Sequence, residues 1–432
     1  MNTDVYSITA ADLAAGAAQG LPDELRTDTH LIYNSPGSLD FNSPGASSFG
    51  VKRAALAIPG SIMLLISPAC CGRNTAALSG PRYAGRCAYL ELDENDIVTG
   101  KHLAKIPAAV AAFVASRPVP PSAVSLCITC VDALLGTDME RVARRCAERV
   151  HLPVIPCYMY ALTRESSLPP MVYVRESIYK QLQPRQKDSR AANILGFFTT
   201  LAPDCELFEL LHGIGIKQIR SLGSCRTYAE FERLAEANFN LVLSGEVRSS
   251  AAWMEHELQI PAIELKRVYS LNQVDNQYKG LGHVLGAEFD TERYRAEAEQ
   301  AIAALTRLAS RNKKPRLAVG SQLNADPFEL ASSLIAVGLD VAEIFGTPQP
   351  EDAFYLKKIA AASPATRIYT ALSPSMLNFD REHSSVTLAI GTDAIYYHPR
   401  AIPLSWNDEA QPFGYQGITL LYKKLLEALT ND

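Results

Sequence analysis

The cysteines are the residues of this sequence whose type and spacing point most directly to chemistry. The chain has nine of them, at positions 70, 71, 87, 127, 130, 146, 157, 205 and 225. Seven of the nine lie between positions 70 and 157. Thiolates bind soft metals and act as redox nucleophiles, so this clustering predicts sulfur-dependent chemistry in the first part of the chain.

Two cysteine patterns deserve separate interpretation. Cys70 and Cys71 are adjacent in ISPACCGRNT, and Cys127 and Cys130 form a CxxC in AVSLCITC. A CxxC is compatible with a thioredoxin-like redox pair, whereas the second CxxC that a zinc ribbon needs is missing. Cys127 lies inside an apolar run, where packing in the core is the simpler interpretation. Cys130 lies where that run ends and a loop begins.

The elements around these cysteines predict a parallel α/β domain. The apolar run 123–129 is typical of a buried strand, and 106–116 favours a helix. A further helix is expected to begin at the capping box 137–140, followed by a strand at 152–160. This is a βαβ unit, whose ligands bind at the carboxyl ends of the strands. The loops that carry Cys70–Cys71, Cys87 and Cys130 are therefore expected to meet at one edge, as an iron–sulfur cluster would require.

The rest of the chain predicts two more α/β series. The polar stretch 179–191 is typical of a linker, and apolar strand-like and helix-like segments alternate after it. A long helix at 291–313 separates the second series from the third. We expect three α/β domains of the doubly wound, Rossmann-like class, at 1–185, 186–310 and 311–432.

Composition excludes several classes of partner. Hydrophobic residues make up 47% of the chain and the formal net charge is -5, without a Lys/Arg-rich block that would favour nucleic acid. The longest apolar run, 56–66, is shorter than the roughly 20 residues that a membrane span needs. The N-terminus lacks the pattern of a secretory signal. We therefore expect a cytoplasmic protein with no nucleic-acid or membrane partner.

Three motifs in order resemble the nitrogenase component 1 family. They are the loop Pro68–Cys71, then Cys87 ahead of Asp96–Gly100, and then Cys130 ahead of a Leu-Leu-Gly-Thr-Asp stretch that ends at Asp138. The segment LSWNDEAQPFGYQGITLL, near the C-terminus, resembles the family's C-terminal pattern of Ser-Trp, glycines and a helix. The likeness covers most of the chain.

The resemblance implies a fold and a set of ligands. Subunits of the family have three Rossmann-like domains around a central cleft, and each offers three cysteines to an iron–sulfur cluster at the subunit interface. These ligand positions fall on Cys71, Cys87 and Cys130. Cys70 takes a place usually held by glycine, and Cys70 and Arg73 are further candidates for contact with the cluster; a loop-stabilising role for Arg73 is the alternative. The resemblance implies a 4Fe–4S cluster or a P-cluster-like 8Fe–7S cluster, shared with a partner subunit, with the cysteine spacing of a β-type subunit.

Two departures from the family pattern bear on catalysis. Catalytic α subunits hold the iron–molybdenum cofactor through a cysteine after a strand of the middle domain and a histidine just before Ser-Trp. Here the corresponding strand reads LVLSGEVRSS, without cysteine, and Leu404 precedes Ser405. His398 lies nearby and is interpreted as a loop histidine and not as a ligand.

These features lead to one expected function and two alternatives. The first is an oxidoreductase subunit, active only in complex, that accepts low-potential electrons from an iron protein. ATP would bind only to that iron protein, and the other partners would be a second component 1 subunit or a copy of this chain, and a small-molecule substrate. The second is a non-catalytic scaffold or electron-relay subunit for metallocofactor assembly. The third is an ordinary ligand-binding α/β protein whose cysteines only fill the core.

Overall fold

The computed structural model describes residues 4–16, 20–26, 51–69, 83–128, 135–158, 170–310 and 315–430. Its contacts form two compact units, each built from separate stretches of chain. Unit 1 comprises Met1–Ser48, Leu201–Ile214 and Lys266–Asp432, and unit 2 comprises Phe49–Thr200 and Gly215–Leu265. The three sheets that the sequence predicts are present, but the grouping of segments around them differs from the three expected ranges.

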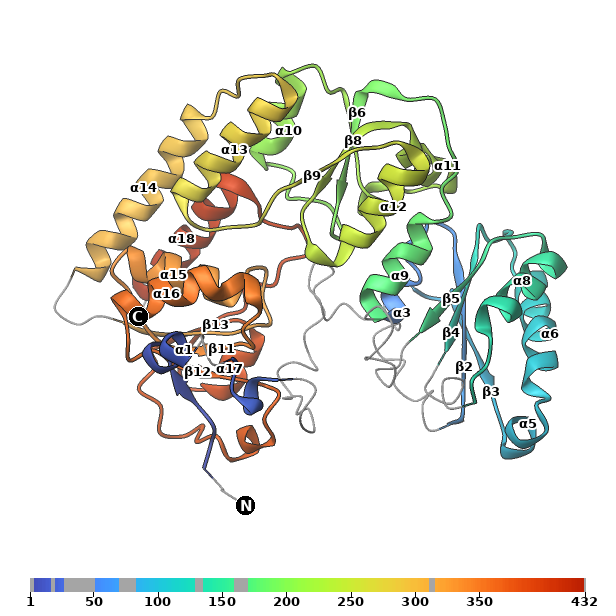
Figure 1. Cartoon of the computed structure of the whole chain (residues 1–432), viewed down its shortest axis with the longest axis horizontal. Coiled ribbons are helices and arrows are strands. Elements are labelled where there is room, and N and C mark those ends of the chain that lie inside the picture. Colours follow the sequence, from blue (N-terminus) through green and yellow to red (C-terminus); the bar gives the residue numbers. More distant parts are fainter. Residues whose placement is uncertain are drawn as a thin grey trace. The chain divides into compact units, whose positions relative to one another are not determined.

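Unit 2 contains two four-stranded parallel sheets, which we call sheets B and C (Figure 1). The strands of sheet B are β2 (Ile62–Ser67), β3 (Cys87–Glu91), β4 (Val124–Ile128) and β5 (Val154–Tyr158), in the order β3-β2-β4-β5. The strands of sheet C are β6 (Asp188–Leu195), β7 (Gln218–Arg220), β8 (Ala237–Val242) and β9 (Ala262–Glu264), in the order β7-β6-β8-β9. Both sheets therefore have the same doubly wound order.

Helices cover both faces of sheet B. Alternate residues of a strand point to opposite faces, so Ile62, Leu64 and Ile66 join one core cluster, while Met63 and Leu65 join another. The first cluster is closed by α6 (His102–Ala115) and α8 (Met139–Val150), which confirms both predicted helices. Asp138 caps α8 by accepting a hydrogen bond from Arg141 N at 2.9 Å.

The second cluster joins the two sheets of unit 2. It contains residues of α3 (Val51–Ala54) and α9 (Pro170–Tyr179) together with apolar side chains of sheet C and of its helix α12 (Arg248–Leu258). Unit 2 is completed by α5 (Glu94–Thr99), α11 (Tyr228–Glu232) and the 3-10 helices η3 (Leu222–Ser224), η4 (Arg233–Glu236) and η5 (Gly245–Val247). The sequence predicts helices at α12 and at α11 with η4, where the apolar periodicity is regular, but it does not predict α5 or α9.

Unit 1 is built on a six-stranded sheet, which we call sheet A. Its strands are β1 (Ile8–Thr9), β10 (Arg316–Val319), β11 (Asp340–Phe345), β12 (Arg367–Tyr369), β13 (Leu388–Ile390) and β14 (Ile402–Leu404). The five parallel strands follow the Rossmann order β12-β11-β10-β13-β14, and β1 pairs antiparallel with β12. The N-terminal strand thus belongs with the last sheet, whereas the sequence placed it in the first expected domain.

Eight helices and three 3-10 helices accompany sheet A in the part of unit 1 that the structure describes. They are α1 (Ala10–Gly16), η1 (Asp23–Leu25), α10 (Glu206–Gly213), α13 (Leu271–Leu285), α14 (Glu292–Ala309), α15 (Pro327–Ala336), η6 (Pro350–Asp352), α16 (Ala353–Ala362), η7 (Pro374–Asn378), α17 (Thr392–Tyr397) and α18 (Gly414–Thr430). Figure 1 shows α14 and α18 as long neighbouring helices. Among the described helices, none has the length and the apolar character that crossing a bilayer demands.

Candidate functional site

The expected site lies after strands that flank the switch point of sheet B. A switch point is the place where the connections of a doubly wound sheet leave in opposite directions, and ligands bind at the carboxyl ends of the strands there. In sheet B it lies between β2 and β4, which are paired from Ile62↔Val124 to Ile66↔Ile128. Both strands therefore end at the same edge, β2 at Ser67 and β4 at Ile128.

The cysteines expected to be ligands follow these two strand ends in the sequence. Cys70 and Cys71 come three and four residues after Ser67, and Cys130 comes two residues after Ile128. Cys70, Cys71, Arg73 and Cys130 lie outside the described residues. Their chain positions agree with the expectation that the segments carrying Cys71 and Cys130 begin at one edge of the sheet.

Cys87 occupies a different place from the expected one. It is the first residue of β3 and pairs with Met63, near the start of β2, whereas Ser67 at the end of β2 pairs with Glu91. Four residues of strand correspond to about 13 Å, so the backbone of Cys87 lies near the opposite, amino-terminal edge. Its half-buried side chain packs against the core cluster that contains Met63. The sequence could not give this position, because a single cysteine before an apolar run does not tell where the strand begins.

The other described cysteines of sheet B and its helices are core residues. Cys127 and Cys157 face each other on β4 and β5 and are fully buried, which confirms the core interpretation of Cys127. Burial raises the pKa of Cys157 to about 12 and that of Cys146, on α8, to about 11. These groups therefore remain neutral thiols at ordinary pH. Within the described stretches, no three His, Cys, Asp or Glu side chains come together as a metal site.

Charged side chains that were not predicted from the sequence lie at the switch point of sheet C. It lies between β6 and β8, and the buried Arg175 of α9 reaches the loops that follow both strands. Arg175 Nη1 donates to the carbonyl of Gly196 at 2.8 Å, and Nη2 pairs with Glu246 Oε2 at 2.7 Å. The guanidinium also lies 4.2 Å from the ring centroid of Phe198. A charged residue within the apolar stretch MVYVRESIY was the only available signal.

The segment that directly follows β8 contains no cysteine. β8 ends at Val242, and Leu243 and Ser244 follow. The Ser244 hydroxyl accepts a hydrogen bond from Glu246 N at 3.3 Å and so begins the short helix η5. Ser244 therefore serves local backbone geometry.

The switch point of sheet A is closed by a buried carboxylate. It lies between β10 and β13, where Asp393 accepts hydrogen bonds from Ser321 N at 2.8 Å, Ser321 Oγ at 2.8 Å and Gln322 N at 3.1 Å. Gly320 is required here, because a Cβ at that position would lie 2.0 Å from Asp393 Oδ1. The carboxylate fills the space that a ligand takes in other Rossmann-like sheets.

His398 is a buried, paired side chain directly after α17. Its Nδ1 lies 2.7 Å from Ser384 Oγ and its Nε2 lies 3.0 Å from Glu343 Oε2. Both ring nitrogens are therefore engaged within unit 1. This agrees with the interpretation that His398 is not a metal ligand.

The Ser-Trp and glycine motif near the C-terminus has a structural role in unit 1. Trp406 is buried, and its Nε1 donates to Tyr269 Oη at 2.8 Å. Farther along, the buried Glu206 accepts hydrogen bonds from Tyr415 N at 2.6 Å and Gln416 N at 3.2 Å and so caps α18. Gly414 has φ +62, and a Cβ there would lie 1.9 Å from Glu206 Oε1. The second part of the motif therefore preserves the start of α18.

Comparison with known proteins decides the family. The family described as Nitrogenase component 1 type Oxidoreductase matches residues 47–430, which is most of the chain. This chain belongs to that family. The curated relatives include the nitrogenase iron-molybdenum cofactor biosynthesis protein NifE of Nostoc, which is 24% identical over 406 residues that cover 89% of this chain and 83% of the relative. The NifE protein of Klebsiella pneumoniae is 23% identical over 381 residues, covering 82% of each.

Solved structures of the family share the fold. The nitrogenase Cp1 structure at pH 6.5 superposes with a TM-score of 0.68 at 15% identity and covers 96% of each chain. The nitrogenase Cp1 structure at pH 5 gives a TM-score of 0.61 at 16% identity, covering 94% of this chain and 90% of that one. The α/β, nitrogenase component 1-like fold with Rossmann-like parallel sheets is therefore established for this family member.

Proposed function

We propose that this chain is a non-catalytic scaffold or electron-relay subunit that takes part in assembling a metallocofactor. In this proposal it carries an iron–sulfur cluster at the switch point of sheet B, where Cys71 and Cys130 are the ligands from this chain. It works in the cytoplasm with a second component 1 subunit, or a copy of itself, and with an ATP-dependent iron protein.

The absence of both catalytic cofactor ligands from their motif positions is the observation that carries the proposal. Ser244 follows β8 where a cysteine is expected in a catalytic α subunit, and Leu404 ends β14 where a histidine is expected. Ser244 is engaged with the backbone of η5, and His398 with Ser384 and Glu343. Relatives that match over four-fifths of this chain or more carry the name of cofactor biosynthesis proteins, which supports the same function.

The donor set after sheet B fits an iron–sulfur cluster. Cysteine thiolate is the usual ligand of such clusters, and a cluster supplies one-electron storage and transfer when bound. Cys71 and Cys130 follow the two strands that flank the switch point in the sequence, and these strands are apolar and buried near their ends, at Ile66 and Ile128. Apolar side chains near a cluster lower the local dielectric constant and so influence the reduction potential of the cluster. Ligands from a partner subunit would complete the coordination.

The ligand assignment of Cys87 stays a prediction from the resemblance alone. Its pairing with Met63 at the amino-terminal edge of sheet B supports a role in the core instead. We therefore propose Cys71 and Cys130 as the principal ligands, with Cys70 and Arg73 as neighbours that contact the cluster.

A catalytic reductase subunit is the second candidate. The family's description as an oxidoreductase and the likeness of the fold to nitrogenase chains favour it. In that case the subunit would accept low-potential electrons from the iron protein and pass them to a small-molecule substrate.

The test is an anaerobic transfer assay with the purified complex of this chain and its partner subunit. The complex is loaded with iron, sulfide and molybdate in the presence of the iron protein, ATP and reductant, and is then mixed with a cofactor-free component 1 protein. The proposal predicts that metal moves to the acceptor and restores its activity. Sustained ATP-dependent reduction of a small substrate by the complex alone would contradict it and favour the reductase.

A further inference from the structure

Three of the six residues that line a small pocket in unit 2 are arginines. The pocket has a volume of 190 Å³ and lies beside the end of β7, against η3, α11 and η4. Its lining residues are Arg220, Ser224, Cys225, Arg226, Glu230 and Arg233. It is distinct from the switch points of the three sheets.

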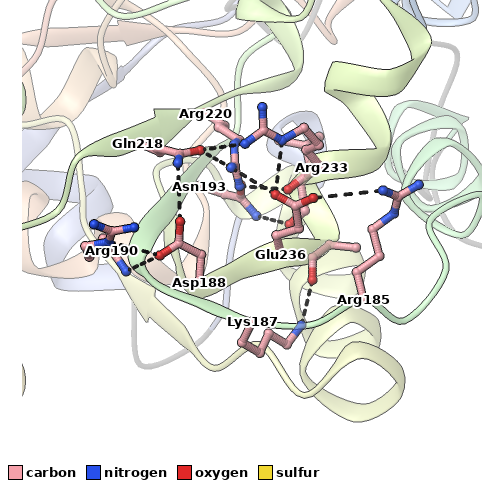
Figure 2. A network of polar contacts seen from close by, with 11 residues as sticks. Arg185, Lys187, Asp188, Arg190, Asn193, Gln218, Arg220, Arg233 and Glu236 are labelled. Carbon is pink, nitrogen blue, oxygen red and sulfur yellow. Dashed lines mark hydrogen bonds and ion pairs between the residues drawn. The ribbon is translucent and has the colours of Figure 1, made fainter.

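One carboxylate forms ion pairs with several of the arginines around this pocket (Figure 2). Glu236 pairs with Arg220 Nη2 at 3.0 Å, with Arg233 Nε at 3.1 Å and with Arg185 Nη1 at 3.9 Å. Gln218 Oε1 accepts hydrogen bonds from both Arg220 and Arg233. Arg185 has a closer partner in Glu232 Oε2, at 3.1 Å. Glu236 therefore mainly pairs with Arg220 and Arg233. The network fixes the side chains of Arg220 and Arg233, which carry two positive charges against the one carboxylate of Glu236.

Arg226 adds to this surplus of positive charge. Its guanidinium makes no ion pair or hydrogen bond with the described residues, although its backbone N donates to Glu230 Oε2 at 2.6 Å. Glu230 is the one carboxylate in the lining, and it also accepts from Thr227 N at 3.4 Å to cap α11. Arg233 is 46% exposed and uses Nε and Nη2 within the protein. Two guanidinium groups therefore have donors left for a ligand.

The remaining wall of the pocket is uncharged. The Ser224 hydroxyl donates to the carbonyl of Ser221 at 2.8 Å, and the Cys225 thiol lies 3.2 Å from the same carbonyl. Burial raises the pKa of Cys225 to about 12, so no thiolate competes for the arginines. Glu230 is the one lining group that repels an anion. The backbone N–H groups of Arg226 and Thr227 lower its pKa, so it stays ionised and offsets one of the three guanidinium charges.

We infer that this pocket binds a small tetrahedral oxyanion of the phosphate class, held by the guanidinium groups of Arg226 and Arg233 with Arg220 behind them. The planar guanidinium group matches phosphate oxygens in bidentate geometry, and the charge-assisted bonds are about twice as strong as neutral ones. The volume admits a phosphate group and part of a small molecule attached to it. This inference does not rest on the proposed function.

The test is isothermal titration calorimetry of the full chain at fixed ionic strength, with inorganic phosphate in one arm and glycerol 3-phosphate in the other. Sodium chloride at the same ionic strength is the blank. Stronger binding of inorganic phosphate assigns the site to the free ion, and stronger binding of glycerol 3-phosphate assigns it to a phosphorylated metabolite. Absence of binding in both arms overturns the inference.

A matched pair of variants decides whether the pocket is the site. Arg226→Ala removes no ion pair of the fold and is expected to weaken anion binding by about tenfold or more, as the loss of a bidentate charge-assisted contact predicts. Arg190→Ala is the control, since Arg190 is 59% exposed and pairs with Asp188 outside the lining. It is expected to change the affinity by less than about twofold. Equal affinities for wild type and Arg226→Ala would overturn the inference.

Discussion

The switch points of sheets A and B both lie between parallel strands, but different residues follow those strands. In sheet A the carboxylate of Asp393 binds the backbone N–H groups that follow β10, so a group of the protein itself fills the ligand position. In sheet B the strands that flank the switch point lead in the sequence to Cys71 and Cys130. The comparison teaches that sheets of one fold class differ at their switch points: a carboxylate closes the one in sheet A, whereas the one in sheet B leads in the sequence to the cysteines proposed as ligands.

The switch point of sheet C is occupied by charged side chains of the protein. The Arg175–Glu246 pair joins the loops after β6 and β8, and Ser244 replaces the expected cysteine. Side chains of the protein therefore connect the loops at this switch point, as they do in sheet A.

The two tryptophans allow each unit to be followed separately. Trp253 lies in unit 2 and Trp406 in unit 1, and the chain has no others. In a Trp253→Phe background the fluorescence reports on unit 1, and in a Trp406→Phe background it reports on unit 2. Urea unfolding in these backgrounds measures the effect of a substitution in its own unit.

The largest stability effect is expected for Asp393→Ala at the switch point of sheet A. The substitution leaves the N–H groups of Ser321 and Gln322 without their acceptor, which is expected to lower the free energy of unfolding by about 3–4 kcal/mol. Asp393→Asn keeps one acceptor oxygen and should cost roughly half as much. An equal, small effect of both substitutions would mean that the carboxylate does not close this switch point.

Arg175→Met tests the corresponding pair at the switch point of sheet C. It removes a buried cation and leaves Glu246 unpaired, and we expect a loss of about 2–4 kcal/mol in urea unfolding followed by Trp253. The double variant Arg175→Met/Glu246→Gln should recover part of this loss, because no lone charge remains. Failure to recover would show that the contacts with Gly196 and Phe198 matter more than the ion pair.

A buried carboxyl group is expected to make the stability of unit 1 depend on pH. Burial raises the pKa of Glu329, on the helix after β10, to about 8 from its ordinary value of 4.5. Its contribution to stability is therefore complete below pH 4.5 and is lost as pH rises towards 8. Urea unfolding in the Trp253→Phe background should show lower stability at pH 8.5 than at pH 5.5, and Glu329→Gln should flatten that slope. A slope unchanged by Glu329→Gln would contradict this origin.

The smallest effects are expected for cysteines that only fill the core of unit 2. Cys157→Ala removes a fully buried thiol next to Cys127, and we expect a loss of about 1–2 kcal/mol without any change in bound iron. Iron is measured by mass spectrometry of anaerobically purified protein. A loss of iron in this variant would place the cluster inside the sheet and not at its edge.

Much of the fold can be predicted from the sequence because strands and helices alternate with clear apolar periodicity. The run 123–129 became β4, and the capping signal before Met139 became the start of α8, with Asp138 as the cap. The pairing of β1 with β12 could not be predicted, because two residues carry no periodic signal and their partner lies more than 350 residues away. The grouping of 201–214 with the C-terminal sheet likewise depends on contacts that only folding creates, such as Glu206 with Tyr415.

The family could be predicted from the sequence, whereas the candidate site stays a prediction. The order of Cys71, Cys87 and Cys130 in the sequence led to the family, and the family match bears this out. The register of β3 could not be read from the sequence, so Cys87 was expected at the same edge as the other two cysteines. Arg175 and Glu206 were missed because a charged residue in an apolar stretch, as at Arg175, does not show that it is buried until its partners are known.

The most direct test of the account is the iron and sulfide content of the anaerobically purified complex in a series of cysteine variants. Cys71→Ala and Cys130→Ala are expected to lose most of the iron and the visible charge-transfer absorption that wild type shows, whereas Cys87→Ala retains most of both. Cys157→Ala is the matched control for a buried thiol. Wild-type iron content in Cys71→Ala and Cys130→Ala, or a wild-type complex without iron, would contradict the assignment of a cluster to the switch point of sheet B.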